Sequence, residues 1–149
     1  MKTARVFEDL YLAMFHFLMF NKHQITELAA ARGLTAMQAS TLVFISTAGR
    51  PQPMNHLCTM FGCDASNITG LVDGLESKGL VARRENPEDR RVKMLELTTA
   101  GQAECKAIIT GLAGKGGYLL RTFSEHELAQ LTALMQKAAG SYTSQAAKP

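Results

Sequence analysis

Residues 67–101, NITGLVDGLESKGLVARRENPEDRRVKMLELTTAG, contain the change of pattern that decides the fold. Up to Lys78 the apolar residues recur every three or four positions, which is the period of an amphipathic helix. Asp64 is placed to cap this helix, and Gly79 is placed to close it. From Leu80 the period falls to about two, so LVARRE and RRVKMLELT are predicted to be the strands of a hairpin joined by the turn NPED.

A shorter helix is predicted just upstream, at Met54–Phe61, and Gly62 is expected to end it. Two helices joined by a brief turn and followed at once by a hairpin form the pattern of a winged helix-turn-helix. The first turn of the second helix presents Ser66, Asn67 and Thr69, whose short side chains can hydrogen-bond to base edges or phosphates. The alternative is that these residues only favour the start of a helix and contact no DNA. The buried face of this helix is predicted to hold Ile68, Leu71, Val72 and Leu75.

The hairpin turn is stiff and carries four charges in a row. Arg90 suits a DNA minor groove, where a guanidinium gains from the concentrated negative potential. Glu88 and Asp89 would be repelled by phosphate, so at least one of them is expected to have an internal role. Asp73 lies near the base of the hairpin, and Arg91 is a plausible partner that would fix the angle of the wing. A merely solvated turn is the alternative.

Long helices are predicted on both sides of this region. Residues 5–31 are predicted to form a helix with apolar side chains on more than one face. Such a helix has to be buried by its own domain and by a partner, so dimerisation is expected. Thr35 and Gln38 form a capping box that opens a helix running to about Thr47. Thr98 is expected to cap a long helix that runs past Tyr118, with a middle weakened by Gly111, Gly114, Gly116 and Gly117.

The chain is expected to end with a helix opened by the capping box of Ser124 and Glu127 and with a frayed tail, residues 141–149. Its apolar face is predicted to hold Leu128, Leu131, Leu134 and Met135.

Composition sets broad limits on function. The formal net charge is +3 and the pI is about 8.9, while residues 50–93 hold seven Lys or Arg against six Asp or Glu. DNA binding would therefore depend on the placement of charge and not on its excess. The chain shows no signal-peptide pattern and no apolar run near the ~20 residues of a membrane helix, so a cytoplasmic protein without membrane association is expected.

Nothing in the sequence indicates an enzyme. Nucleophile elbows, phosphate-binding loops and His-Glu-x-x-His motifs are absent, and the four histidines are scattered. The three cysteines, Cys58, Cys63 and Cys105, show no metal-ligand or redox-motif spacing. No cofactor and no metal site are expected.

Residues 67–101 closely resemble the signature of the MarR family of bacterial transcription regulators, through LVDGLESKGLV followed by PEDRRVKMLELTTAG. The order of helices also matches, so the resemblance covers nearly the whole chain. It implies a homodimer that binds a palindromic DNA duplex. It also implies three regions: an N-terminal dimerisation helix at 1–34, a winged helix-turn-helix at 35–98 and C-terminal dimerisation helices at 99–149.

The resemblance carries roles over to individual positions. It makes Ser66, Asn67 and Thr69 groove-facing, Arg90 the wing-tip arginine and Asp73 an acid that supports the wing. Many relatives carry basic residues where this chain has Gly70 and Gly74. Phosphate anchoring is therefore expected from Lys78, Arg83, Arg84 and Lys93.

MarR-like proteins typically bind a small, often phenolic or aromatic acid between the dimerisation helices and the winged lobe, and then release DNA. The resemblance thus implies a repressor relieved by such an effector. A histidine can partner a carboxylate without the cost of a buried lysine, which favours His16. The candidate pocket residues are Tyr11, Met14, Phe15, His16, Phe44 and Tyr118.

Two alternatives stay open. Cys63 precedes the reading helix, where the helix dipole favours a thiolate, so it or Cys58 could sense oxidants. The other alternative is a winged helix that docks a protein instead of DNA.

Overall fold

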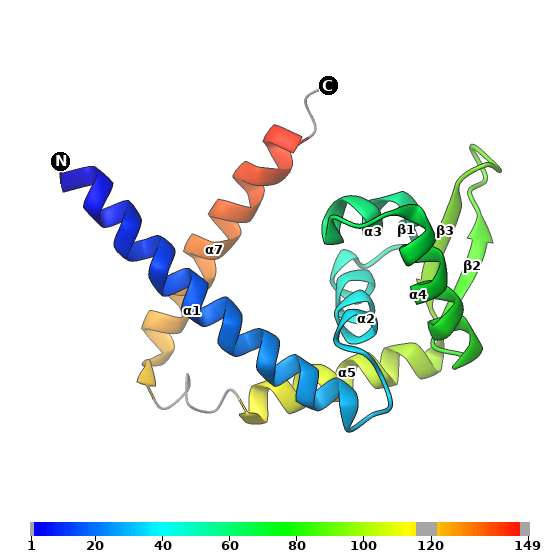
Figure 1. Cartoon of the computed structure of the whole chain (residues 1–149), viewed down its shortest axis with the longest axis horizontal. Coiled ribbons are helices and arrows are strands. Elements are labelled where there is room, and N and C mark those ends of the chain that lie inside the picture. Colours follow the sequence, from blue (N-terminus) through cyan, green and yellow to red (C-terminus); the bar gives the residue numbers. More distant parts are fainter. Residues whose placement is uncertain (1, 116–121, 147–149) are drawn as a thin grey trace. The chain divides into compact units, whose positions relative to one another are not determined.

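The computed structural model describes residues 2–115 and 122–146 and divides into two compact units after Leu112 (Figure 1). The first unit contains α1 (Lys2–Ala30), α2 (Ala36–Ala48), β1 (Gln52–Pro53), α3 (Met54–Phe61), α4 (Ala65–Ser77), β2 (Val81–Glu85), β3 (Lys93–Leu97) and most of α5 (Thr99–Lys115). The second unit contains α7 (Glu125–Ala146). The predicted fold class, mainly helical with a small β-hairpin, is confirmed.

The sheet has three strands in the order β1-β3-β2, one more than predicted. β2 and β3 form the expected antiparallel hairpin, with Arg83 opposite Leu95, but the strands are shorter and the connection spans residues 86–92. The extra strand, β1, pairs Gln52 with Leu95 and Pro53 with Met94. β1 has only two residues, too few to show the alternating pattern of a strand in the sequence. Its proline is tolerated because β1 lies at the edge of the sheet.

Three of the four predicted helix starts have the expected caps. Thr35 and Gln38 form both hydrogen bonds of a capping box, and the Thr98 hydroxyl accepts the Gly101 N–H at 3.0 Å. Asp64 occupies the predicted N-cap position of α4, but its side chain makes no cap hydrogen bond.

The start of α7 is capped as predicted. Ser124 N–H donates to Glu127 at 2.9 Å, and Glu127 N–H donates back to the Ser124 hydroxyl at 3.3 Å. The hydrogen bonds from Ser124 lower the pKa of Glu127 below its ordinary value. A carboxylate with a lowered pKa stabilises the folded helix at neutral pH, and this contribution is lost as the pH falls through that pKa.

Glycines in left-handed conformation end four helices of the first unit, Gly49 at the end of α2 and three others at the predicted stops. Gly33, Gly62 and Gly79 have φ of 67°, 60° and 68°, a region that side chains with a Cβ disfavour. Each predicted stop at a glycine is confirmed. α7, by contrast, continues to Ala146 through residues predicted to fray. Tyr118 lies outside the described residues.

The core of the first unit joins α2, α3, α4, the sheet and α5. The expected apolar face of α4 is confirmed, with Ile68, Val72 and Leu75 buried and Leu71 packed against them. The largest fully buried apolar side chains are Leu42, Leu57, Ile68, Leu75, Leu95, Ile108 and Val72. This core fixes α3, α4 and the hairpin as one winged helix-turn-helix lobe.

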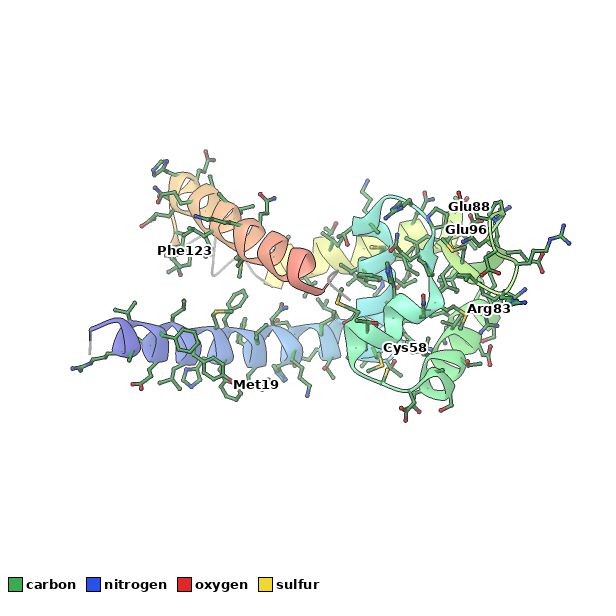
Figure 2. All side chains as sticks on the ribbon, turned by 90° about the horizontal axis from the view of Figure 1, so that it is seen from above. Met19, Cys58, Arg83, Glu88, Glu96 and Phe123 are labelled. Atoms are coloured by element: carbon green, nitrogen blue, oxygen red, sulfur yellow. The ribbon has the colours of Figure 1, made fainter. Side chains whose placement is uncertain are left out.

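The N-terminal two-thirds of α1 exposes a broad apolar surface. Phe7 is 66% exposed and Tyr11 is 61% exposed, and Met19 projects from the same helix (Figure 2). The exposed apolar residues of this helix are Val6, Phe7, Leu10, Tyr11, Leu12, Met14, Phe15, Leu18, Met19 and Phe20. Among the described residues, no helix is both long and apolar enough to cross a membrane.

Glycines in α5 permit close contacts with neighbouring elements. A Cβ on Gly111 would lie 2.9 Å from Cδ2 of Leu28, so this glycine allows α5 to pack closely on α1. Gly101 is tighter still, because its Cβ would lie 1.9 Å from the carbonyl oxygen of Leu80. That oxygen also accepts the Thr98 N–H, so the wing base and the start of α5 are in direct contact.

Gly101→Ala should destabilise the protein by at least about 1–3 kcal/mol, because backbone must move to admit the methyl group. Gly114→Ala is the matched control, since nothing lies within 4 Å of its added Cβ and it lies in the same helix. The control should be neutral or stabilise by up to ~1 kcal/mol. Thermal unfolding followed by circular dichroism measures both, and equal effects of the two substitutions would contradict the close contact.

Candidate nucleic-acid interface

The first turn of α4 presents polar side chains to solvent. Ser66, Asn67 and Thr69 are exposed, while Ile68 between them is buried. The Thr69 hydroxyl donates to the Ala65 carbonyl at 2.8 Å, which leaves its oxygen as an acceptor. Because the Asp64 side chain does not cap the helix, the first N–H groups of α4 retain their capacity to meet an anion.

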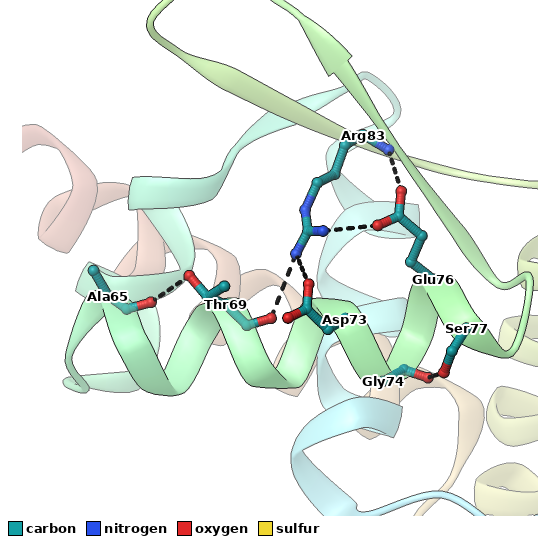
Figure 3. Close-up of polar contacts among 7 residues, drawn as sticks. All are labelled: Ala65, Thr69, Asp73, Gly74, Glu76, Ser77 and Arg83. Carbon is teal, nitrogen blue, oxygen red and sulfur yellow. Dashed lines mark hydrogen bonds and ion pairs between the residues drawn. The ribbon is translucent and has the colours of Figure 1, made fainter.

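Arg83 ties the wing to α4 (Figure 3). From β2 its guanidinium reaches the Asp73 carboxylate at 2.5 Å and the Glu76 carboxylate at 2.7 Å. It also donates to the Thr69 carbonyl at 3.4 Å, while its own backbone N–H faces Glu76. One side chain thus contacts three successive turns of the helix, so β2 is held alongside α4 in a fixed direction.

The predicted partner of Asp73 was Arg91, and this prediction is wrong. Arg83 occupies that place because β2 follows α4 directly and runs back along it, whereas Arg91 lies beyond the turn at the far end of the hairpin. Arg91 instead donates its backbone N–H to Asp89 at 3.0 Å. Asp73 still contacts the wing, but through a residue predicted to anchor phosphate.

The wing loop, residues 86–92, is ordered by its own hydrogen bonds. The Asn86 side chain accepts the Glu88 N–H at 3.0 Å, and the Asp89 carbonyl accepts the Val92 N–H at 2.9 Å. These bonds hold the loop around Arg90, whose exposed side chain has no hydrogen bond or ion pair within the described part of the chain. The wing therefore presents a cation on a stiff support.

Two other predicted phosphate anchors form ion pairs across the hairpin. Arg84 pairs with Glu96, and Lys93 pairs with Glu85 at 3.1 Å. The cations of both pairs are exposed, and exposed ion pairs contribute only about 0–1 kcal/mol, so a phosphate can replace the carboxylate with little loss of stability. Lys78 is exposed at the end of α4 and makes no ion pair within residues 2–115.

The two glycines of α4 differ in their surroundings. A Cβ on Gly70 would meet nothing within 4 Å, so this position is open. A Cβ on Gly74 would lie 2.7 Å from Nε2 of Gln38, the residue that closes the capping box of α2. Gly74 therefore allows α4 to pack closely on α2.

A cavity of about 430 Å³ lies in the first unit. The C-terminal end of α2, the following loop, β3 and α5 line it, through Ile45, Ser46, Gly49, Arg50, Pro51, Glu96, Leu97 and Gln102. None of the five predicted pocket residues within the described part of the chain lines this cavity. Tyr11, Met14, Phe15 and His16 are exposed on α1, and Phe44 is half-buried on α2. Their role in a pocket stays a prediction, and no sequence signal marked Arg50 or Gln102.

The architecture defines a winged helix-turn-helix protein. A profile of the MarR family matches residues 32–92. The HTH-type transcriptional repressor YetL of Bacillus subtilis is 31% identical over 121 residues, which are 80% of this chain and 72% of the relative. The multiple antibiotic resistance protein MarR of Escherichia coli is 30% identical over 115 residues, which are 76% of this chain and 78% of that protein. The chain belongs to the MarR family of transcriptional regulators.

A solved structure supports the same conclusion. A cysteine-to-serine variant of Escherichia coli MarR complexed with operator DNA is similar with a TM-score of 0.65 and 26% identity, covering 87% of this chain and 93% of that one. The fold class and the family resemblance inferred from residues 67–101 are thus confirmed. The roles of individual DNA-contacting residues stay predictions.

A double-mutant cycle tests which arginine supports the wing. Asp73→Asn combined with Arg83→Gln should show a coupling of about 0.5–1 kcal/mol in the free energy of unfolding, because the pair is in direct contact but partly exposed. Asp73→Asn combined with Arg91→Gln is the matched control and should be additive. Coupling to Arg91 instead would restore the sequence-based assignment.

Proposed function

We propose that this protein is a homodimeric repressor that binds a palindromic DNA operator and leaves it when a small aromatic acid binds. The observation that carries the proposal is the pairing of an exposed polar first turn on α4 with a stiff wing that displays Arg90. β2 runs back alongside α4, so the wing loop lies toward the end of the helix that carries Ser66 and Asn67 (Figure 3).

In this proposal each element reads a different part of the duplex. Asn67 and Ser66 contact base edges in the major groove, where an amide side chain can form paired hydrogen bonds with adenine. Arg90 enters the adjacent minor groove. Arg84, Lys93 and Lys78 contact phosphates, with Arg84 and Lys93 exchanging their carboxylate partners for the DNA backbone.

The exposed apolar surface of α1 supports the dimer. Ten large apolar side chains at 41–66% exposure form a larger patch than a soluble monomer usually leaves in water. A second copy of the chain can bury these side chains, because the same surface of both copies can pack together around a two-fold axis. Two lobes related by that axis match an inverted repeat, and the regions 1–34 and 99–149 are proposed to build the interface.

The repressor role rests on relatives. YetL is named a transcriptional repressor, and it shares 31% identity with this chain. A dimer bound over a promoter blocks transcription sterically, so release of DNA is the natural point of control.

The cavity beside Arg50 is the proposed effector site. It combines the apolar walls of Ile45, Pro51 and Leu97 with one cation, which suits an aromatic ring bearing a carboxylate. Glu96 lines the same cavity and pairs with Arg84 on β2. A bound carboxylate would repel Glu96 and disturb the strand pair that supports the wing, which couples the effector to DNA.

Selection of duplexes from a random library should enrich an inverted repeat with half-sites about one helical turn apart. On the selected site, Asn67→Ala should relax preference at one base pair by about 1–3 kcal/mol. Arg84→Ala should weaken binding to every sequence and lower the salt slope by about one unit. Light scattering of each variant provides the control for an intact dimer.

Arg90→Ala should weaken operator binding more than Glu88→Ala does. Equal affinity of Arg90→Ala and the parent would exclude the wing contact. No enriched sequence from an intact dimer would favour a protein-docking module.

Hydroxybenzoic acids should release the selected duplex in a fluorescence anisotropy assay. Arg50→Ala should raise the half-releasing concentration by about tenfold, since an ion pair to a ligand contributes about 1.4 kcal/mol. Lys106→Ala removes an exposed cation outside the cavity and is the matched control. Unchanged release in Arg50→Ala would move the effector site elsewhere, with the predicted residues on α1 and Phe44 as the next candidates.

A further inference from the structure

Within the first unit, α1 packs on the winged lobe through its C-terminal turns (Figure 1). Residues 4–23 are exposed, except for the half-buried Phe17, whereas Ile25 packs against the core and Ala29 is fully buried in it. At a rise of 1.5 Å per residue, the exposed part is an arm of about 30 Å. The direction of this arm is set by the contacts at its base.

Apolar contacts at the base keep α1 on the lobe. Leu28 lies against Gly111 of α5, where an added Cβ would be 2.9 Å from Cδ2 of the leucine. Ala29 and Leu34 are buried on either side of the left-handed Gly33. Apolar burial is not directional, so these contacts leave the tilt of the arm to other interactions.

A two-point ion pair between the end of α1 and α5 supplies the directional contact. Arg32, in the turn after α1, donates from Nη2 to Oε2 of Glu104 at 3.0 Å, and its Nε–H donates to Oε1 of the same carboxylate. A paired contact of this kind fixes the relative orientation of the two groups as well as their distance. The Glu104 side chain is only 21% exposed and precedes the buried Cys105, so its backbone is held by the core.

A small tilt at this base is magnified along the arm. The exposed apolar surface between Val6 and Phe20 is centred about 15 residues from Leu28, which is roughly 22 Å along the helix. A tilt of about 10° therefore moves that surface by about 4 Å relative to the lobe, more than the rise of about 3.4 Å per base pair in DNA. The direction of α1 is thus measured on the scale of single base pairs.

We propose that the ion pair of Arg32 with Glu104 determines the spacing of the two half-sites that the dimer binds best. This proposal rests on the proposed function, because it needs a dimer that meets through α1 and binds an inverted repeat. With the pair intact, each lobe has one orientation relative to the two-fold axis, so one spacing is favoured. Without the pair the arm tilts, and operators one base pair shorter or longer lose less affinity. Arg32 and Glu104 are positioning residues that contact no DNA in this proposal.

The test measures the affinity of the full-length dimer for three duplexes by fluorescence anisotropy. They carry the selected inverted repeat with its own spacer, with one base pair removed and with one base pair added. In Arg32→Glu and in Glu104→Arg the preference for the selected spacer should fall by about fivefold, the scale of one partly exposed ion pair. Glu104→Gln, which keeps the size of the side chain, should change the preference in the same direction.

The charge-swapped protein, with Arg32→Glu and Glu104→Arg together, should regain the parent preference, because the reversed pair can form the same contact. His23→Gln is the matched control. It removes the 3.3 Å pair of His23 with Glu27, which lies within α1 and does not join α1 to the lobe, so the spacing preference should stay unchanged. Circular dichroism and light scattering of each variant check the fold and the dimer.

A role in stability alone would lower the affinity for all three duplexes by the same factor, and that result would overturn the proposal. Unchanged preference in the single variants, or no recovery in the charge-swapped protein, would also overturn it. In those cases the parent still selects an inverted repeat, so the proposed function stands. The absence of any inverted repeat selected by the intact parent dimer would instead overturn the proposed function, and the spacing proposal with it.

Discussion

The ion pairs of Arg83 with Asp73 and Glu76 hold the hairpin against α4. Each ion pair alone adds little to the free energy of folding, because it is partly exposed to water. The guanidinium also donates to the Thr69 carbonyl, so Arg83 connects the hairpin to three turns of α4. The direction of the wing loop depends on this side chain and on the contact between Gly101 and Leu80 at the opposite end of the hairpin.

The features predicted correctly from sequence are those decided by neighbours in the chain. The capping boxes of Thr35 and Ser124 and the stop at Gly62 need only residues within five positions, and their chemistry admits few alternatives. The α4 face that includes Ile68 follows from helical period alone. Local patterns therefore sufficed for the order of the described helices and of the β2–β3 hairpin, and for the exposed first turn of α4.

The errors concern contacts between residues that the chain brings together only in three dimensions. Arg83 and Arg91 are equally plausible partners for Asp73 until the direction of β2 is known. β1 forms because Gln52 pairs with Leu95 of β3. A strand of two residues is too short to be predicted from its sequence pattern. The cavity beside Arg50 has walls from four elements, and polar loop residues of this kind look like ordinary surface in the sequence. Side-chain placement across elements was thus beyond sequence reasoning.

The two glycines of α4 differ in how readily they can be substituted. At Gly70 the helix surface is open, so a single substitution to lysine or arginine would add a phosphate contact without rearranging the lobe. At Gly74 an added side chain displaces the amide of Gln38, whose Oε1 atom accepts the Thr35 N–H in the capping box of α2. Gly70 therefore offers the simpler route to tighter DNA binding, because a substitution there leaves the packing of α4 on α2 unchanged.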